Sequence, residues 1–131
     1  MKKIMIGYDG SNAAKDALEL AVKHAKAFGA ELFIIRSLVG GAGQGPDKIE
    51  NANRDIAYAE SFCKEQGVSF ESHLLVRGLN PAEDLVQFAE EQNVDEIVIG
   101  VRRRSKVGKM VFGSNAREVI LNAPCPVVTI K

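Results

Sequence analysis

The feature that most constrains this chain is the regular alternation of short apolar runs with stretches of helical periodicity. The apolar runs predict strands at residues 3–8, 31–38, 68–76, 95–99 and 127–130. Between them, apolar residues recur at helical spacing after Ser11, from about 47 to 66, after Pro81 and after Gly113. Strands that alternate with helices predict a parallel sheet that is covered on both faces. We therefore expect an α/β fold with an open five-stranded parallel sheet, in the strand order 3-2-1-4-5.

Residues at the predicted helix ends support this division. Ser11 is a candidate N-cap, and Asn80 followed by Pro81 forms a second start signal. Gly29 is a candidate C-cap for the first helix. The apolar face expected for that helix comprises Ala14, Leu18, Ala21, Val22, Ala25 and Phe28. The glycine-rich segment 40–46 is expected to be a loop, either a mobile connection or a lid over a ligand.

Composition narrows the class of protein. With 131 residues the chain has the length of one domain, so we expect a single domain over 1–131. Its formal net charge is zero, and any affinity for polyanions must come from a local patch. No apolar run is long enough to span a membrane, and the apolar start ends by Asp9, too early for a secretory signal. We expect a cytoplasmic protein.

The few cysteines and histidines fit that expectation. Cys63 and Cys125 lack a CxxC partner and are interpreted as reduced thiols. The chain has two histidines, which disfavours a histidine-based metal site.

One basic segment, residues 100–114, is a candidate anion site. It carries five cations and no acidic residue, begins with Gly100 at a strand end, and closes with Gly113 and Ser114 before a helix. Free N–H groups and the positive end of a helix dipole favour phosphate. The alternative is a solvated basic loop. If the first and fourth strands flank the point where strand order reverses, this segment meets residues 9–11 at one crevice.

Several known sequence patterns are excluded: the P-loop, the dinucleotide-binding fingerprint and the receiver domain. The P-loop pattern fails at Arg103, where its first glycine should stand, and at Met110, where Ser or Thr should stand. The GxGxxG fingerprint of dinucleotide-binding folds is absent after the first strand. A receiver domain needs an aspartate at the end of the third strand, and Val76-Arg77-Gly78 offers none.

The chain resembles the universal stress proteins over essentially its whole length. The resemblance rests on Ile4-Met5-Ile6-Gly7-Tyr8-Asp9-Gly10-Ser11, on Pro124-Cys125-Pro126-Val127-Val128, and on the segment 100–114. ATP-binding members carry Gly, two residues, Gly, nine residues, then Gly and Ser or Thr. Gly100, Gly113 and Ser114 occupy three of these four positions, and Arg103 replaces the second glycine.

This resemblance implies a Rossmann-like fold of the adenine-nucleotide alpha hydrolase type, and a site for ATP, or for ADP or AMP, with Mg²⁺. It implies that Asp9 lies near the ribose and the phosphate-bound metal, and that the main chain at Ser37 lies beside the base. Gly7 and Ile99 would line the pocket, and Arg102 would add charge beside Arg103. The residues that the resemblance assigns to phosphate are Gly100, Gly113, Ser114 and Asn115.

Arg103 leaves two functions open. Its side chain could extend outward and bind phosphate, in a nucleotide-binding regulatory or stress-response module that acts on an unknown partner. It could instead close the pocket, leaving a dimeric interaction protein of the same fold. A nucleic-acid binder is disfavoured because Phe112 is the one aromatic residue of the basic segment.

The sequence offers no nucleophile–base pair, so at most slow ATP hydrolysis is expected. The resemblance also implies a homodimer that pairs through the last strand, residues 126–130. An unpaired apolar edge there would otherwise be a liability.

Overall fold

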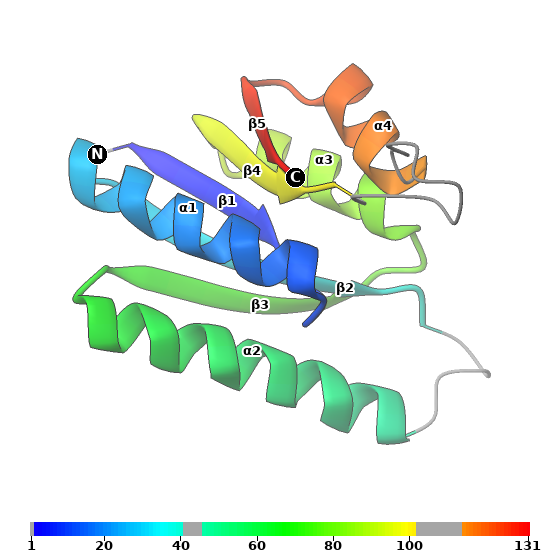
Figure 1. Ribbon diagram of the computed structural model, residues 1–131. Coiled ribbons are helices and arrows are strands. Elements are labelled where there is room, and N and C mark those ends of the chain that lie inside the picture. Colours follow the sequence, from blue (N-terminus) through cyan, green and yellow to red (C-terminus); the bar gives the residue numbers. More distant parts are fainter. Residues whose placement is uncertain (1, 41–45, 102–113) are drawn as a thin grey trace, which may run out of the picture.

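The computed structural model describes residues 2–40, 46–101 and 114–131. The chain forms alternating strands and helices around one parallel sheet (Figure 1). The elements are β1 (Lys3–Gly7), α1 (Asn12–Phe28), β2 (Glu31–Leu38), α2 (Pro46–Gln66), β3 (Phe70–Val76), α3 (Pro81–Glu91), β4 (Glu96–Gly100), α4 (Ser114–Asn122) and β5 (Val127–Ile130). The strand order is β3-β2-β1-β4-β5, so the predicted fold class and order are confirmed.

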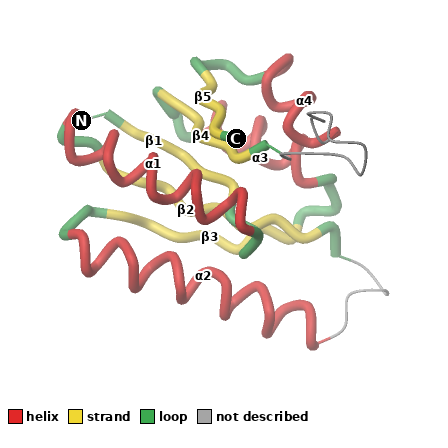
Figure 2. The backbone as a smooth tube through the Cα atoms, viewed as in Figure 1, coloured by secondary structure: helices red, strands yellow, loops and turns green. Residues whose placement is uncertain are grey.

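Two helical layers enclose the sheet (Figure 2). On one face, α1 and α2 pack on Ile4, Ile6 and Ile34. On the other, α3 and α4 pack on Met5, Phe33 and Ile97. Neighbouring residues of a strand point to opposite faces, and both faces of the central strands are covered, so the middle of each of these strands is a run of buried apolar residues.

The caps of α1 and α3 form as the sequence predicts. The Ser11 hydroxyl accepts a hydrogen bond from the Ala14 N–H at 3.1 Å, and Gly29 ends α1 in the left-handed conformation. At α3, the Asn80 side chain accepts from the Glu83 N–H while the Glu83 carboxylate accepts from the Asn80 N–H, a complete capping box.

Some local expectations were wrong, and the first and fourth strands end one residue from their predicted ends, at Gly7 and Gly100. Phe28 does not join the buried face of α1 but is 54% exposed, with the Lys2 ammonium 4.2 Å from its ring centre. The third strand begins at Phe70 and not at Val68. The Val68 N–H is bonded instead to the Cys63 carbonyl, in the turn that Gly67 makes at the end of α2.

The sheet reverses its winding between β1 and β4. From β1 the chain passes through α1 to β2, the neighbour of β1 in one direction. The neighbour in the other direction is β4, which the chain reaches from β3 through α3. Parallel sheets of this kind bind ligands beyond the carboxyl ends of the strands at such a point. The expected site is therefore at the ends of β1 and β4, where residues 9–11 and Gly100 lie. Over the described residues, no helix combines the length and the apolar character that a membrane crossing requires.

Candidate functional site

A cleft opens at the carboxyl ends of β1, β2 and β4. It has a volume of about 140 Å³, below the roughly 300–1,000 Å³ of typical ligand sites, and it is open to solvent. This space accommodates one ring system, and a larger ligand would extend outward from the strand ends. The lining residues are Gly7, Tyr8, Asp9, Ser11, Ala14, Ile35, Arg36, Ser37, Pro81, Leu85, Ile99, Gly100, Asn115, Ala116 and Val119.

The turn after β1 presents an exposed carboxylate. Asp9 Oδ1 accepts a hydrogen bond from the Ser11 N–H at 3.0 Å, which holds the carboxylate beside the start of α1. Gly10 has φ +79°, and a Cβ there would lie 2.5 Å from Asp55 Oδ1 on α2. The left-handed backbone conformation therefore favours glycine here, and a larger residue would also displace the Asp55 side chain. Asp9 is exposed at the mouth of the cleft.

Gly100 has a packing role in addition to the one expected from sequence. A Cβ at this position would overlap the carbonyl of Ala13, in the first turn of α1. Glycine therefore lets α1 pack directly against the end of β4. At Gly7, an added Cβ would lie 2.8 Å from a methyl group of Leu85. Both glycines shape the floor of the cleft by bringing neighbouring elements close.

The main chain at Ser37 is directed toward the cleft. In β2, the Glu31 N–H bonds to Lys2 in the β1 direction, and the Leu32 N–H bonds to Ser69 in the β3 direction. Successive residues of a parallel strand alternate in this way. Ile35 accepts from the Tyr8 N–H at 2.8 Å, and Ser37, two residues later, has the same orientation. The β1–β2 pairing ends at Gly7 and Ile35, so the N–H and C=O of Ser37 point past the end of β1.

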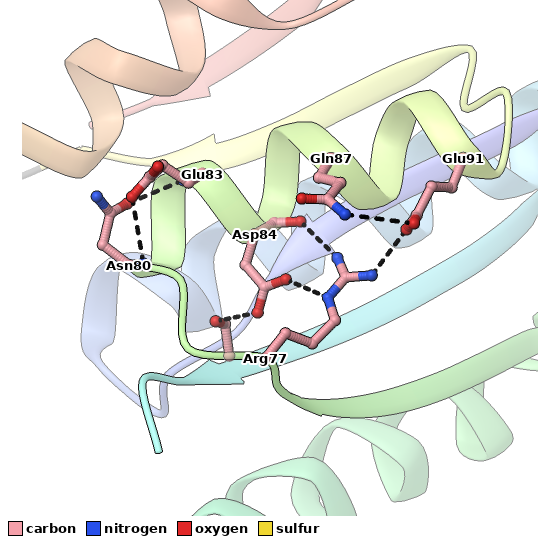
Figure 3. A network of polar contacts seen from close by, with 7 residues as sticks. Arg77, Asn80, Glu83, Asp84, Gln87 and Glu91 are labelled. Atoms are coloured by element: carbon pink, nitrogen blue, oxygen red, sulfur yellow. Dashed lines mark hydrogen bonds and ion pairs between the residues drawn. The ribbon is translucent and has the colours of Figure 1, made fainter. Parts of the chain in front are cut away.

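The Ser37 side chain belongs to a polar network that sequence reasoning missed (Figure 3). Its hydroxyl donates to Asp84 Oδ2 at 2.7 Å, and the Arg77 Nε donates to Asp84 Oδ1 at 2.6 Å. Arg77 also donates to Glu91 Oε1 at 2.8 Å and to the main-chain carbonyl of Asp84 at 3.3 Å. Asp84 is fully buried, where a carboxylate without partners would be costly. Both of its oxygens accept hydrogen bonds here.

Electrostatic shifts follow this network. The hydrogen bond from Arg77 lowers the pKa of the Glu91 carboxyl, and the same contact raises the pKa of Arg77. No sequence motif marks these residues. Asp84 lies in the first turn of α3, where an acidic residue is expected from the helix dipole alone, and Arg77 lies in the preceding turn.

The opposite side of the cleft is less completely paired. The hydroxyl of the buried Tyr8 and the Nε of Arg36 have no hydrogen-bond partner among the described residues. Arg36 Nε lies 3.8 Å from Asp55 Oδ2, a long ion pair. Tyr8 stacks on Tyr58 with a ring separation of 6.4 Å. Burial raises the pKa of Tyr8 to about 12, assisted by electrostatic interactions with the nearby Tyr58, Asp55 and Asp9.

The cleft contains most of the residues expected from sequence that lie in the described ranges. Gly7, Asp9, Ser37, Ile99, Gly100 and Asn115 all line it. Ser114 is the first residue of α4. Arg102, Arg103 and Gly113 lie outside the described residues, as do residues 41–45 of the glycine-rich segment. Tyr8, Arg36 and Leu85 also line the cleft and were not expected there, because the packing of whole strands and of α3 places them.

The described residues include no group of three or more His, Cys, Asp or Glu side chains that could hold a metal ion. At the cleft, Asp9 supplies a single exposed carboxylate. A hard divalent cation such as Mg²⁺ keeps several waters and is commonly held by one or two carboxylates together with substrate phosphates. The residues present therefore fit a metal that arrives with a phosphate ligand, and not a metal held by protein alone.

Comparisons with known proteins show which family has this sequence and fold. The model of the "Universal stress protein family" matches residues 1–131. A universal stress protein of Thermus aquaticus is 35% identical, with 99% of this chain and 98% of the relative covered. The solved universal stress protein of Archaeoglobus fulgidus is 39% identical, with a TM-score of 0.94, and covers 100% of this chain and 99% of that one.

A second solved structure from Archaeoglobus fulgidus is described as a universal stress protein in complex with dAMP. It is 36% identical, with a TM-score of 0.88, covering 100% of this chain and 98% of that one. The match of the family model over residues 1–131, together with relatives above 30% identity over nearly their full length, shows that the chain belongs to the universal stress protein family.

Proposed function

We propose that this protein binds an adenine nucleotide, ATP or the related ADP or AMP, and acts as a regulatory or stress-response module. One observation carries the proposal. The cleft at the reversal point of the sheet is lined by six of the residues expected from sequence, and its size suits a ring system. The dAMP complex of a relative that is 36% identical supports the choice of an adenine nucleotide.

In this proposal the base lies beside the main chain of Ser37, where β2 extends past β1. The ribose lies toward Asp9. The phosphates extend over Gly100 toward Gly113, Ser114 and Asn115 at the start of α4, where free N–H groups and the helix dipole favour an anion. Arg102 and Arg103 supply positive charge to the phosphates.

Mg²⁺ enters this proposal with the nucleotide. Asp9 would act on the metal indirectly, with the phosphates providing the other ligands. Replacing Asp9 with Asn keeps an oxygen that can accept from the Ser11 N–H but removes the negative charge. We expect Asp9→Asn to weaken binding of Mg-ATP more than binding of ATP in the presence of a chelator.

The first test is to denature the purified protein and identify any released nucleotide by mass spectrometry. Calorimetric titration with Mg-ATP then measures affinity and stoichiometry. We expect about one adenine nucleotide per chain. Asn115→Ala is a suitable weakening variant because Asn115 is exposed at the cleft, and Asn122→Ala, at the other end of α4, is its matched control.

A protein that is purified empty and does not bind added Mg-ATP would contradict the proposal. In that case Arg103→Gly separates two explanations. Binding gained by the variant would mean that Arg103 closes the site of a dimeric interaction protein. No binding by either protein would leave the fold without a nucleotide function.

We further propose that the protein is a homodimer that pairs through residues 126–130. β5 pairs with β4 along one edge, and no described strand pairs with its other edge. On the neighbouring α4, Leu121 is 74% exposed and Ile120 is 41% exposed. An antiparallel pair of β5 strands would cover this edge. A monomer by light scattering at micromolar concentration would contradict the dimer.

A further inference from the structure

The cleft contains one main-chain segment whose position depends on buried side chains far away in sequence. β2 extends past the end of β1, so the N–H and C=O of Ser37 have no strand partner on the cleft side among the described elements. A strand end of this kind is free to shift unless something else holds it. Here the Ser37 hydroxyl is anchored to Asp84, which lies 47 residues away on α3.

The anchor is unusually complete. Asp84 has no exposed surface, and its two carboxylate oxygens accept at 2.7 Å from Ser37 and at 2.6 Å from Arg77. Arg77 makes two further hydrogen bonds, to the Asp84 carbonyl and to Glu91 (Figure 3). Charge-assisted bonds at these distances restrict side-chain motion strongly. The end of β2 is thereby fixed to the first turn of α3.

We propose that Asp84 and Arg77 are positioning residues for base selection. They hold Ser37 so that its main-chain N–H and C=O present one donor and one acceptor in a fixed order to the edge of the base. This inference rests on the proposed nucleotide function and goes beyond it, because neither Asp84 nor Arg77 lines the cleft.

A donor and an acceptor that are held in place distinguish bases by the order of the donor and acceptor groups on the base. Adenine offers an amino donor beside a ring-nitrogen acceptor on its Watson–Crick edge, and guanine offers a carbonyl acceptor beside a ring N–H donor. A main-chain pair that is held in place matches one order and leaves groups unpaired with the other. A main-chain N–H and C=O that can shift position tolerate either base. Rigid placement is therefore what converts a general contact into a preference for adenine.

The test compares three ligands on four proteins. Affinities for Mg-ATP, Mg-GTP and magnesium tripolyphosphate are measured by calorimetry for the wild type, Asp84→Asn, Ser37→Ala and Glu91→Gln. Asp84→Asn weakens the anchor and Ser37→Ala removes its hydroxyl. Glu91→Gln is the matched control, since it alters only the exposed end of the Arg77 contacts and leaves Ser37–Asp84 intact.

We expect the wild type and Glu91→Gln to prefer ATP over GTP. In Asp84→Asn and Ser37→Ala, this preference falls by about tenfold, the effect of losing one well-placed hydrogen bond. Tripolyphosphate affinity stays within about twofold, because the phosphates lie at the other end of the cleft. A general loss of folded protein would instead weaken all three ligands together. Ligand-free proteins provide a second readout: amide hydrogen exchange at Arg36 and Leu38, whose N–H groups face β3, accelerates in both anchor variants and not in Glu91→Gln.

Three outcomes overturn the inference. An unchanged ATP-over-GTP ratio in both anchor variants would contradict it while leaving nucleotide binding intact. A wild type that binds both nucleotides equally would show that no selection needs explaining. A wild type that binds neither nucleotide would contradict the proposed function, and this inference with it.

Discussion

The two sides of the cleft are held in different ways. The α3 side, comprising Ser37, Arg77 and Asp84, is joined by short charge-assisted hydrogen bonds around a fully buried carboxylate. The α1 side, formed by residues 8–14 with Arg36, Asp55 and Gly100, is joined mainly by close packing at glycines. The ion pair between Arg36 and Asp55 on this side is 3.8 Å long.

This difference indicates which side of the cleft can select a ligand and which side can adapt to one. A fully satisfied buried network has one favourable arrangement, so it suits the part of a site that must read a ligand. On the other side, the Tyr8 hydroxyl has no hydrogen-bond partner within the described ranges and the Arg36–Asp55 pair is long, so polar groups remain available to a ligand. The first side should therefore respond strongly to side-chain substitution, and the second should respond chiefly to substitutions at its glycines.

The largest effect is expected from Asp84→Ala. The substitution removes the centre of the α3 side, leaving the Ser37 hydroxyl and Arg77 Nε without their acceptor, and should lower the free energy of unfolding by about 2–4 kcal/mol. Urea denaturation measures it. Glu91→Ala is the control and should lower the free energy of unfolding much less, because its contact with Arg77 is exposed. Equal losses in the two variants would mean that the buried carboxylate has no special weight.

The next effect is expected from Gly100→Ala on the α1 side. The new Cβ meets the Ala13 carbonyl, so α1 must move away from β4, at a cost of about 1–3 kcal/mol. Thermal unfolding without ligand is the measurement. Gly29→Ala is the matched control, because that position has a left-handed backbone but open space around it, and it should cost about 1 kcal/mol. A loss at Gly100 no larger than at Gly29 would contradict the packing role.

A smaller effect is expected from Asp55→Asn, which weakens the long ion pair with Arg36. Both side chains are partly exposed, so the loss of stability should stay below about 1 kcal/mol and shrink further in high salt. Chemical denaturation at low and high salt tests this. A loss as large as that of Asp84→Ala would remove the contrast between the two sides.

The smallest effect at neutral pH is expected from Tyr8→Phe. It deletes a buried hydroxyl that has no hydrogen-bond partner among the described residues, so stability should be unchanged or slightly increased. At alkaline pH the variants should diverge. The folded pKa of Tyr8 is raised from 10.0 to about 12, so wild-type stability is fully present below pH 10 and falls as pH rises toward about 12. Tyr8→Phe should lack this part of the decline, as measured by denaturation at a series of pH values.

Local signals in the sequence predicted much of the fold. The N-caps at Ser11 and Asn80 and the C-cap at Gly29 depend on neighbouring residues, and all three form as expected. The strand order followed from the alternating pattern and the resemblance, and it is confirmed. Phe28 shows the limit: its spacing fits the buried face of α1, but it lies at the helix end and is 54% exposed.

The candidate site was predicted in part. The sequence directed attention to Asp9 and Gly100, which do lie at one cleft, because residues at the carboxyl ends of parallel strands share an edge of the sheet. It supplied a phosphate-related reason for Gly100, whereas the contact with Ala13 is a packing reason that only the structure reveals. Asp84 escaped notice because an acidic residue in the first turn of a helix is ordinary.

By itself, the sequence determined the elements, their caps and the class of sheet, since each depends on periodicity or on contacts within a few residues. The tertiary structure alone decided which distant side chains meet. The hydrogen bond between Ser37 and Asp84 joins residues that are 47 apart in sequence. It forms because α3 packs against β2 on one face of the sheet. The order of strands brings Gly100 against α1 in the same way. Such contacts depend on the register of whole elements, which no local pattern encodes.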